Sequence, residues 1–122
     1  MTSPSSRGRA GEQRVADFLE QKGYNILDRN FRLSLCEVDI IGEKDRVLHF
    51  CEVKTWRSMP FEATEQSLSR QKRQRIQMCA AEFLRRRPEL DGYGVMFDLV
   101  FVDSSSGNIR HIEDAWTPSD DT

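Results

Sequence analysis

Two neighbouring apolar segments that contain acidic residues constrain the fold of this chain more than any other feature. Residues 37–42 and 46–54 are rich in β-branched and aromatic side chains, and the polar turn Glu43-Lys44-Asp45 separates them. Such segments, joined by a short polar connection, are typical of a β-hairpin. Carboxylates inside strands are unusual, because burying a charge is costly unless it is paired or holds a metal ion. The hairpin is therefore a candidate site.

The alternation of side chains along a strand decides where these charges point. On the second strand, Leu48, Phe50, Glu52 and Lys54 share one face. One pairing register brings Asp39 of the first strand to the same end of that face. Two carboxylates and an ammonium at the rim of an apolar face form a candidate metal site, and the alternative is a cross-strand ion pair. Hard oxygen ligands of this kind suit Mg²⁺ or Mn²⁺.

Two further acids are candidates for the same site. Glu12 lies on the helical stripe that also carries Val15 and Leu19, so a helix turns this acid towards the sheet. Glu37 shares the face of Asp39. It is either a ligand for a second metal ion or a salt-bridge partner, and we favour the salt bridge.

The remaining segments predict an α/β protein with a mixed sheet and a helix on either side. Gly23 should end the first helix, Ser69 should cap the second, and Pro88 should stop it. The expected order is α-β-β-β-α-β-β, with helices at residues 10–22 and 70–87 and strands at residues 24–32, 37–42, 46–54, 95–102 and 109–112. The length of 122 residues predicts a single domain at residues 10–116, with residues 1–9 disordered and residues 117–122 a flexible acidic tail.

No segment approaches the apolar length of a membrane span, and the first residues lack the apolar core of a signal peptide. We therefore expect a cytoplasmic protein that does not bind membranes. Cys36, Cys51 and Cys79 are odd in number and lie in apolar patterns, which predicts reduced core thiols. The cysteines, with His49 and His111, lack the close spacing of a zinc motif, so we interpret them as structural.

Charge is segregated along the chain, although the net charge is only −2. Residues 70–87 hold seven basic residues and one acid, a net charge of +6, whereas residues 113–122 hold four acids and no base. Lys72, Arg73 and Arg75 are candidates for nucleic-acid binding through phosphates, and the alternative is a solvated helix face. Trp56 either stacks on a base or covers the neighbouring loop.

A series of short motifs in order along residues 10–116 resembles a known family. The motifs are Gly11-Glu12, Gly23-Tyr24-Asn25-Ile26, Arg29-Asn30-Phe31-Arg32, Glu37-Val38-Asp39-Ile40-Ile41, Glu52-Val53-Lys54-Thr55, Lys72-Arg73-Gln74-Arg75-Ile76 and the strand at residues 97–102. They are similar to those of the YraN-like family (UPF0102) of small bacterial proteins. That family is a predicted nuclease group of the PD-(D/E)xK restriction-endonuclease-like superfamily.

The resemblance implies a restriction-endonuclease-like fold, with Asp39, Glu52 and Lys54 as the Asp…Glu-x-Lys core. It also implies Glu12 as the helix-borne acid that archaeal Holliday-junction resolvases similarly place. Asp39, Glu52, the Val53 backbone carbonyl and Glu12, directly or through water, would then hold Mg²⁺ (or Mn²⁺). Lys54 would position the attacking water.

The expected function is metal-dependent hydrolysis of phosphodiester bonds in DNA, with branched or processed DNA among the candidate substrates. The alternative is a catalytically inactive DNA-binding or adapter module with the same fold. A second copy of the chain, in a homodimer, is a further candidate partner. Departures from the family pattern are Cys36 in place of Gly, His49 and Cys51 in place of apolar residues, and the polar pair Gln66-Ser67. None of them affects the four proposed site residues.

Overall fold

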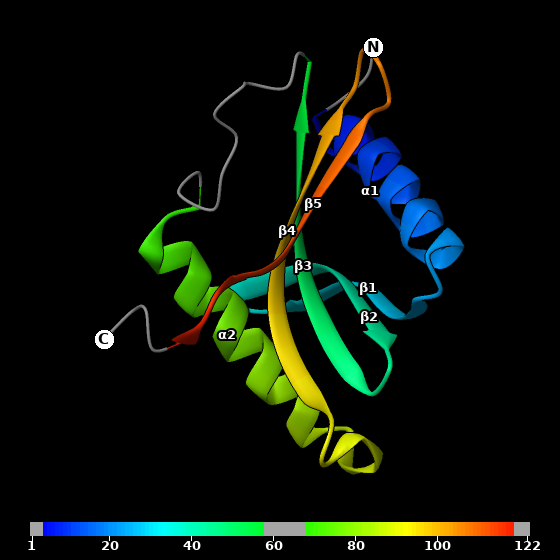
Figure 1. The fold of residues 1–122 in the computed structure, drawn as a ribbon. Helices are drawn as coiled ribbons and strands as arrows, with labels where there is room; N and C mark the ends of the chain where they lie inside the picture. The colour runs from blue at the N-terminus through cyan, green and yellow to red at the C-terminus, as the bar shows by residue number, and fades with distance from the viewer. Residues whose placement is uncertain (1–3, 58–67, 119–122) are drawn as a thin grey trace.

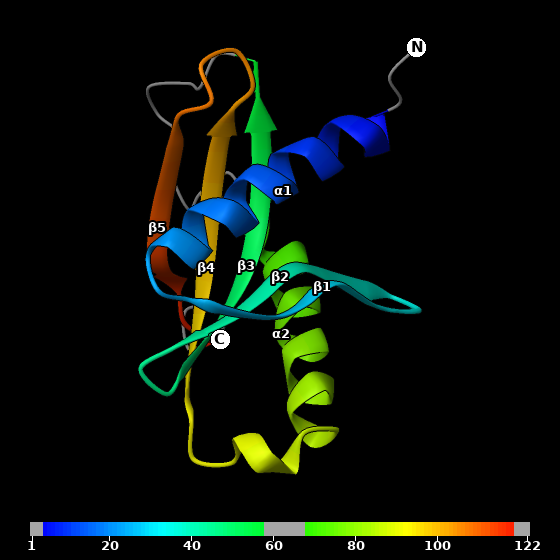
Figure 2. The same ribbon diagram turned by 90° about the vertical axis from the view of Figure 1, so that its right-hand side faces the viewer.

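A mixed sheet separates two helices that cover its opposite faces (Figures 1 and 2). The computed structural model describes residues 4–57 and 68–118, with side chains from Ala10 onwards in the first range. The elements are α1 (Pro4–Gln21), β1 (Asn25–Leu33), β2 (Cys36–Lys44), β3 (Val47–Trp56), α2 (Arg70–Arg85), the 3₁₀ helix η2 (Pro88–Leu90), β4 (Gly94–Asp103) and β5 (Ile109–Trp116). The predicted α/β class and order α-β-β-β-α-β-β are confirmed.

The five strands follow the chain in the order β1-β2-β3-β4-β5. Only the β3–β4 pair is parallel, with ten residue pairs from Val47–Gly94 to Trp56–Asp103, and the other pairs are antiparallel. A parallel pair needs a crossover connection, and α2 lies in it. The β1–β2 hairpin crosses β3 steeply in Figure 2, so the sheet is strongly twisted.

Each helix buries its apolar stripe against one face of the sheet, with α1 mainly over β3 and α2 mainly over β2. On the α2 side, Ile76 and Phe83 pack with Phe50 and Phe101, all of them almost inaccessible to solvent. On the α1 side, Val15, Ala16 and Leu19 pack with Cys51, Val100 and Val102. The helical stripes and the strand alternation expected from the sequence both appear here. As a result, neighbouring residues of β3 face different cores.

The turns and caps agree with local sequence signals to within a residue or two. The tight β2–β3 turn is formed by Asp45 and Arg46, whose φ angles of 53° and 63° match the left-handed conformation of a two-residue hairpin loop. The predicted turn was centred one to two residues too early. Ser69 caps α2 as predicted, because its Oγ accepts a hydrogen bond from the Lys72 N–H at 3.1 Å.

The two terminal elements are longer than predicted. Helix α1 begins at Pro4, so part of the segment expected to be disordered is helical, while residues 1–3 lie outside the described part. Strand β5 continues to Trp116, because Trp116 is buried and stacks on Phe97. The predicted loop at residues 55–67 begins later, since Thr55 and Trp56 belong to β3, and residues 58–67 lie outside the described ranges.

The expectation of three reduced thiols is wrong for two of them. Cys36, at the start of β2, and Cys79, in the middle of α2, form a disulfide with a Cα–Cα distance of 5.9 Å. The apolar stripe of α2 packs against the β1–β2 hairpin, and this contact brings Cys36 and Cys79 together. Cys51 is a buried free thiol, as expected. Within residues 4–57 and 68–118, no helix is both long and apolar enough to span a bilayer.

Candidate active site

Asp39 and Glu52 lie where β2 and β3 separate. The paired residues of these strands run up to Ile40 and Cys51, so Asp39 and Glu52 are the next residues on each strand. Asp39 Oδ2 accepts a hydrogen bond from the Val53 N–H at 2.8 Å. Both acids are buried, with exposed fractions of 9% and 5%. The two predicted acids therefore lie next to each other at the point where the β2–β3 pairing ends.

This carboxylate pair is electrostatically unfavourable without a cation. Burial, and then the negative charge of Glu52, raise the pKa of Asp39 well above its usual value, although the Val53 N–H lowers it. Glu12 adds a further upward influence. Two carboxylates that repel one another in a poorly solvated place favour a proton, an ammonium or a metal ion between them.

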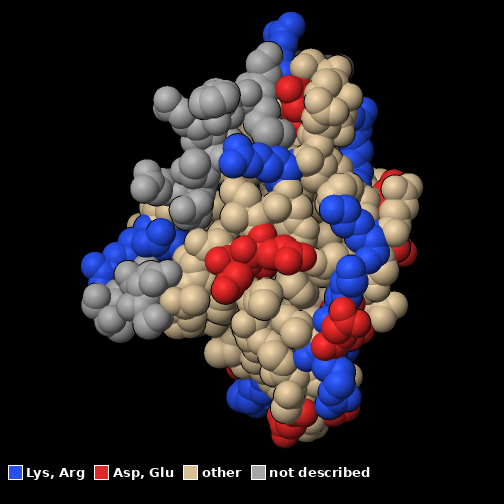
Figure 3. Space-filling model, viewed as in Figure 1, with Lys and Arg blue, Asp and Glu red and all other residues tan. Residues whose placement is uncertain are grey.

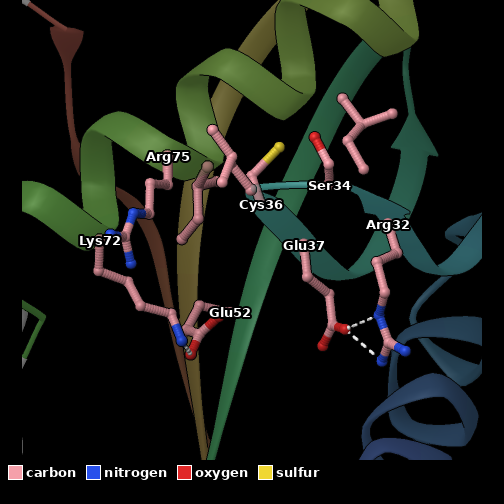
Figure 4. A pocket seen from close by; sticks show the side chains of 10 residues that line it. Arg32, Ser34, Cys36, Glu37, Glu52, Lys72 and Arg75 are labelled. Atoms are coloured by element: carbon pink, nitrogen blue, oxygen red, sulfur yellow. Dashed lines mark hydrogen bonds and ion pairs between the residues drawn. The ribbon is translucent and has the colours of Figure 1, made fainter.

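Two lysines from different elements reach the same carboxylate oxygen. Lys54 Nζ lies 3.5 Å and Lys72 Nζ 3.3 Å from Glu52 Oε2. Figure 4 shows Lys72 reaching from α2 to Glu52, with Arg75 beside it. A pocket of about 270 Å³ lies between α2 and the β1–β2 hairpin, and its lining includes Lys72, Arg75, Glu37 and Glu52. Arg73, which was predicted with Lys72 and Arg75, does not line this pocket.

Glu12 approaches the pair from α1, as its position on the helical stripe predicted. Burial, with the charges of Glu37 and Glu52, raises the pKa of Glu12, whereas a hydrogen bond with Asn30 lowers it. Its Oε2 is buried and has no hydrogen-bond partner among the described residues. Gly11 allows this approach, because a Cβ at that position would overlap the Thr55 Oγ1 of β3. Ligand atoms of Glu12, Asp39 and Glu52 do not all lie within 4.8 Å of one another in the described ranges.

Glu37 and Trp56, for which the sequence left two interpretations each, both contact other residues in the structure. Glu37 forms an ion pair with Arg32 at 2.5 Å, which favours the salt-bridge interpretation over that of a second metal ligand. Trp56 lies against the α2-side core, with its ring centroid 6.4 Å from that of Phe101. Base stacking stays a prediction for Trp56, and most of the loop that it was expected to cover, residues 58–67, lies outside the described ranges.

Sequence reasoning missed the ion pair between Lys72 and Glu52 and the presence of Arg32 in the lining of the pocket. The helical spacing of Lys72 one turn before the buried Ile76 indicated that Lys72 lies near the sheet, but not which acid it meets. Contacts between α2 and β3 depend on the crossover connection, and local patterns do not determine them. The strand alternation did place His49 and Cys51 on the face opposite Glu52, and in the structure Cys51 packs against α1 on that face.

The surface charge is divided. In the view of Figure 1, an acidic patch lies near the middle of the face and Lys and Arg side chains lie around it (Figure 3). The exposed acids of β5 include Glu113 and Asp114, whereas α2 carries exposed Arg70, Lys72 and Arg75. The exposed acids of β5 and the exposed bases of α2 thus lie on different elements.

Comparison with known proteins gives a consistent match over most of the chain. Residues 11–102 match the model of "Uncharacterised protein family UPF0102". A UPF0102 protein of Caldicellulosiruptor bescii is 38% identical over 89% of this chain and 95% of its own length. UPF0102 proteins of Azorhizobium caulinodans and Paramagnetospirillum magneticum are 40% and 41% identical, over 91% and 90% of this chain and 82% and 86% of their own lengths.

Proposed function

The chain belongs to the uncharacterised protein family UPF0102, and we propose that it is a nuclease that uses Mg²⁺ or Mn²⁺ to hydrolyse phosphodiester bonds in DNA. The observation that carries the proposal is the buried pair of Asp39 and Glu52 with Lys54 at 3.5 Å from Glu52. Burying two acids side by side is costly, and a bound divalent cation removes that cost.

The donor atoms fit such an ion. Asp39 and Glu52 supply hard carboxylate oxygens, which Mg²⁺ and Mn²⁺ prefer. The Val53 carbonyl is the proposed third ligand, since the N–H and C=O of one strand residue face the same neighbour and this N–H already contacts Asp39. Glu12 would complete the set through a water, because its buried Oε2 lacks a hydrogen-bond donor among the described residues.

The protein's own side chains would bind and orient the substrate. Lys72 and Arg75 project from α2 into the pocket and would hold phosphate oxygens of the DNA backbone. Lys54 would orient the attacking water and offset the negative charge that develops on the phosphate. The bound ion would supply Lewis-acid polarisation of the phosphate.

A DNA-binding or adapter module without turnover is the second candidate, and the basic face of α2 favours it. Binding to phosphates does not need buried acids, however, and acids beside the site would repel DNA. The combination of Asp39, Glu52 and Lys54 therefore favours the enzyme.

The test is a Mn²⁺-dependent cleavage assay on branched, flapped, single-stranded and double-stranded DNA. We expect Asp39→Ala and Glu52→Ala to abolish Mn²⁺ binding measured by calorimetry. We expect Lys54→Ala to keep Mn²⁺ binding but to lose roughly 100-fold or more in cleavage rate, because its ammonium acts on water and phosphate. The exposed Lys22→Ala variant is the matched control and should retain full activity.

Two results would overturn the proposal. Retained turnover in Lys54→Ala would exclude the proposed role of this lysine. Salt-dependent DNA binding by the wild type without cleavage of any substrate, in Mn²⁺ or Mg²⁺, would identify the binding module instead.

A further inference from the structure

A second buried polar cluster lies on the α1 side of the sheet. Asp98 of β4 is fully buried, and its Oδ2 accepts hydrogen bonds from His49 Nδ1 and His111 Nε2, each at 2.7 Å. Cys51 Sγ lies 4.0 Å from the same oxygen. The N–H of Asp114 donates to the other Asp98 oxygen at 3.0 Å. One carboxylate thus gathers a thiol and two imidazoles in the interior.

Strand pairing builds this cluster from residues far apart in the sequence. Cys51 pairs with Asp98 in the parallel β3–β4 ladder. His111 lies on β5 opposite Val100, next to Asp98 along that face of the sheet. His49 precedes Cys51 by two residues and shares its face. No motif spacing reveals such a set, because it depends on the register of three strands.

The donor atoms are those of a zinc site. Ligand atoms of Cys51, Asp98 and His111 all lie within 4.8 Å of one another, and no other set of three such residues does so in the described ranges. Thiolate, imidazole and carboxylate are the protein ligands of Zn²⁺, whereas Mg²⁺ prefers oxygen alone. His49 hydrogen-bonds Asp98 from outside this set, as outer partners of metal ligands commonly do.

We propose that Cys51, Asp98 and His111 bind one Zn²⁺ ion, with His49 orienting Asp98 as a positioning residue. This site is separate from the carboxylate pair and does not depend on the proposed nuclease activity. Binding would replace the proton of the Cys51 thiol, which would be released to solvent. His111 would bind through Nε2 and carry its imidazole proton on Nδ1 instead.

Burial and access are consistent with a cation at this place. Burial, and then the charge of Asp98, raise the pKa of the Cys51 thiol, so the thiolate needs a compensating positive charge. Burial alone would raise the pKa of Asp98, but hydrogen bonds from His111, His49 and the Asp114 N–H lower it. A pocket of about 240 Å³ borders the cluster at His49, the proposed positioning residue, and its lining also includes Tyr24, Lys44 and Glu113.

The site would tie β3 to β4 and β5 directly behind Glu52, because Cys51 is the preceding residue of β3. A metal bond at this position would limit the movement of the strand that carries Glu52 and Lys54. The expected effect is on stability, and it is measurable without any substrate.

The test uses the full chain with Co²⁺ as a spectroscopic substitute for Zn²⁺. The background is Asp39→Asn/Glu52→Gln, which removes the carboxylate pair as a competing cation site. We expect one equivalent of Co²⁺ to give a thiolate-to-metal charge-transfer absorption, and Zn²⁺ to displace it. Zn²⁺ should also raise the melting temperature.

Substitutions test which residues are responsible for the Co²⁺ absorption and for the stabilisation by Zn²⁺. Cys51→Ala and His111→Gln should lose both the absorption and the stabilisation by Zn²⁺, and His49→Gln should weaken Zn²⁺ binding by about 10- to 100-fold. Cys36→Ala/Cys79→Ala is the matched control and should keep the absorption. Cys51→Val, which also fills the buried space, guards against a folding defect in Cys51→Ala.

Absence of a charge-transfer band at stoichiometric Co²⁺ would overturn the proposal and identify the cluster as a hydrogen-bonded network only. A band that survives in both Cys51 variants would do the same. Neither result would affect the proposed nuclease, whose test depends on Asp39, Glu52 and Lys54.

Discussion

At Asp39, the cost of burying a negative charge determines how the protein should respond to pH. Burial and the neighbouring Glu52 raise the pKa of this carboxyl in the folded state, whereas in the unfolded chain it is about 3.9. Between the unfolded pKa of about 3.9 and the folded pKa of about 8, the folded state binds more protons than the unfolded state. The free energy of unfolding without metal therefore falls as the pH rises through this window.

We expect Asp39→Asn to remove this dependence, because the amide cannot ionise. In EDTA, the stability of the variant relative to wild type should increase by about 1–2 kcal/mol from pH 5 to pH 8, measured by urea unfolding. Mn²⁺ should stabilise the wild type at pH 8 and not the variant. The exposed Glu20→Gln substitution on α1 is the control and should show no such trend. A pH-independent difference would mean that folded Asp39 is ionised throughout.

At the scale of elements, the Cys36–Cys79 disulfide fixes α2 to the β1–β2 hairpin. The bond joins residues separated by 43 positions, one at the start of β2 and the other within the buried stripe of α2. Lys72 lies two helical turns before Cys79, and Asp39 lies three residues after Cys36. The cross-link therefore holds together the two elements that supply opposite charges to the candidate active site.

Reduction of this disulfide should lower the free energy of unfolding by about 2–4 kcal/mol, because the open chain gains conformational freedom when it unfolds. Urea unfolding with and without dithiothreitol measures the difference. Cys79→Ala should unfold like the reduced wild type and should not respond to the reductant. Cys51→Ala should respond as the wild type does. If the reductant leaves wild-type stability unchanged, the two sulfurs are thiols in solution.

Across the whole molecule, the segregation of charge predicts where DNA binds. Residues 70–87 carry a net charge of +6 in a chain of −2, so affinity should fall steeply with salt. Lys72→Ala or Arg75→Ala should each reduce the slope of log K against log salt by about 1, nearly independently of DNA sequence. Arg85→Ala is the control, because Arg85 is paired with Glu82.

The acidic tail should act in the opposite direction. Removal of residues 117–122, of which residues 119–122 lie outside the described ranges, should leave DNA affinity unchanged or raise it. Fluorescence anisotropy over a salt series measures both effects. Unchanged affinity and slope in both basic variants would place the DNA on another face.

Alternation along the strands was sufficient to place Asp39 and Glu52 on one face, but the predicted turn did not set the register. The observed turn at Asp45 and Arg46 pairs Ile40 with Cys51, and this register brings Asp39 beside Glu52. Glu12 followed from a helical stripe in the same way. The disulfide and the cluster around Asp98 could not be predicted, since their partners meet only through the α2 crossover and the parallel β3–β4 register. The full length of β5 was also hidden, because Asp114 adopts φ 52° and breaks the alternation before Trp116 packs.

The two edge strands of the sheet share an irregularity with a consequence for behaviour at high concentration. The register of β1 shifts between Ile26 and Asp28, and Asn30 adopts φ 54°. Opposite β5, the register shifts between Phe97 and Leu99, near the left-handed Asp114. Exposed, regular edges act as templates on which another chain can add a strand, and bulges and charges interrupt them. Neither edge therefore offers a long regular ladder, which disfavours fibril growth and edge-to-edge association of copies.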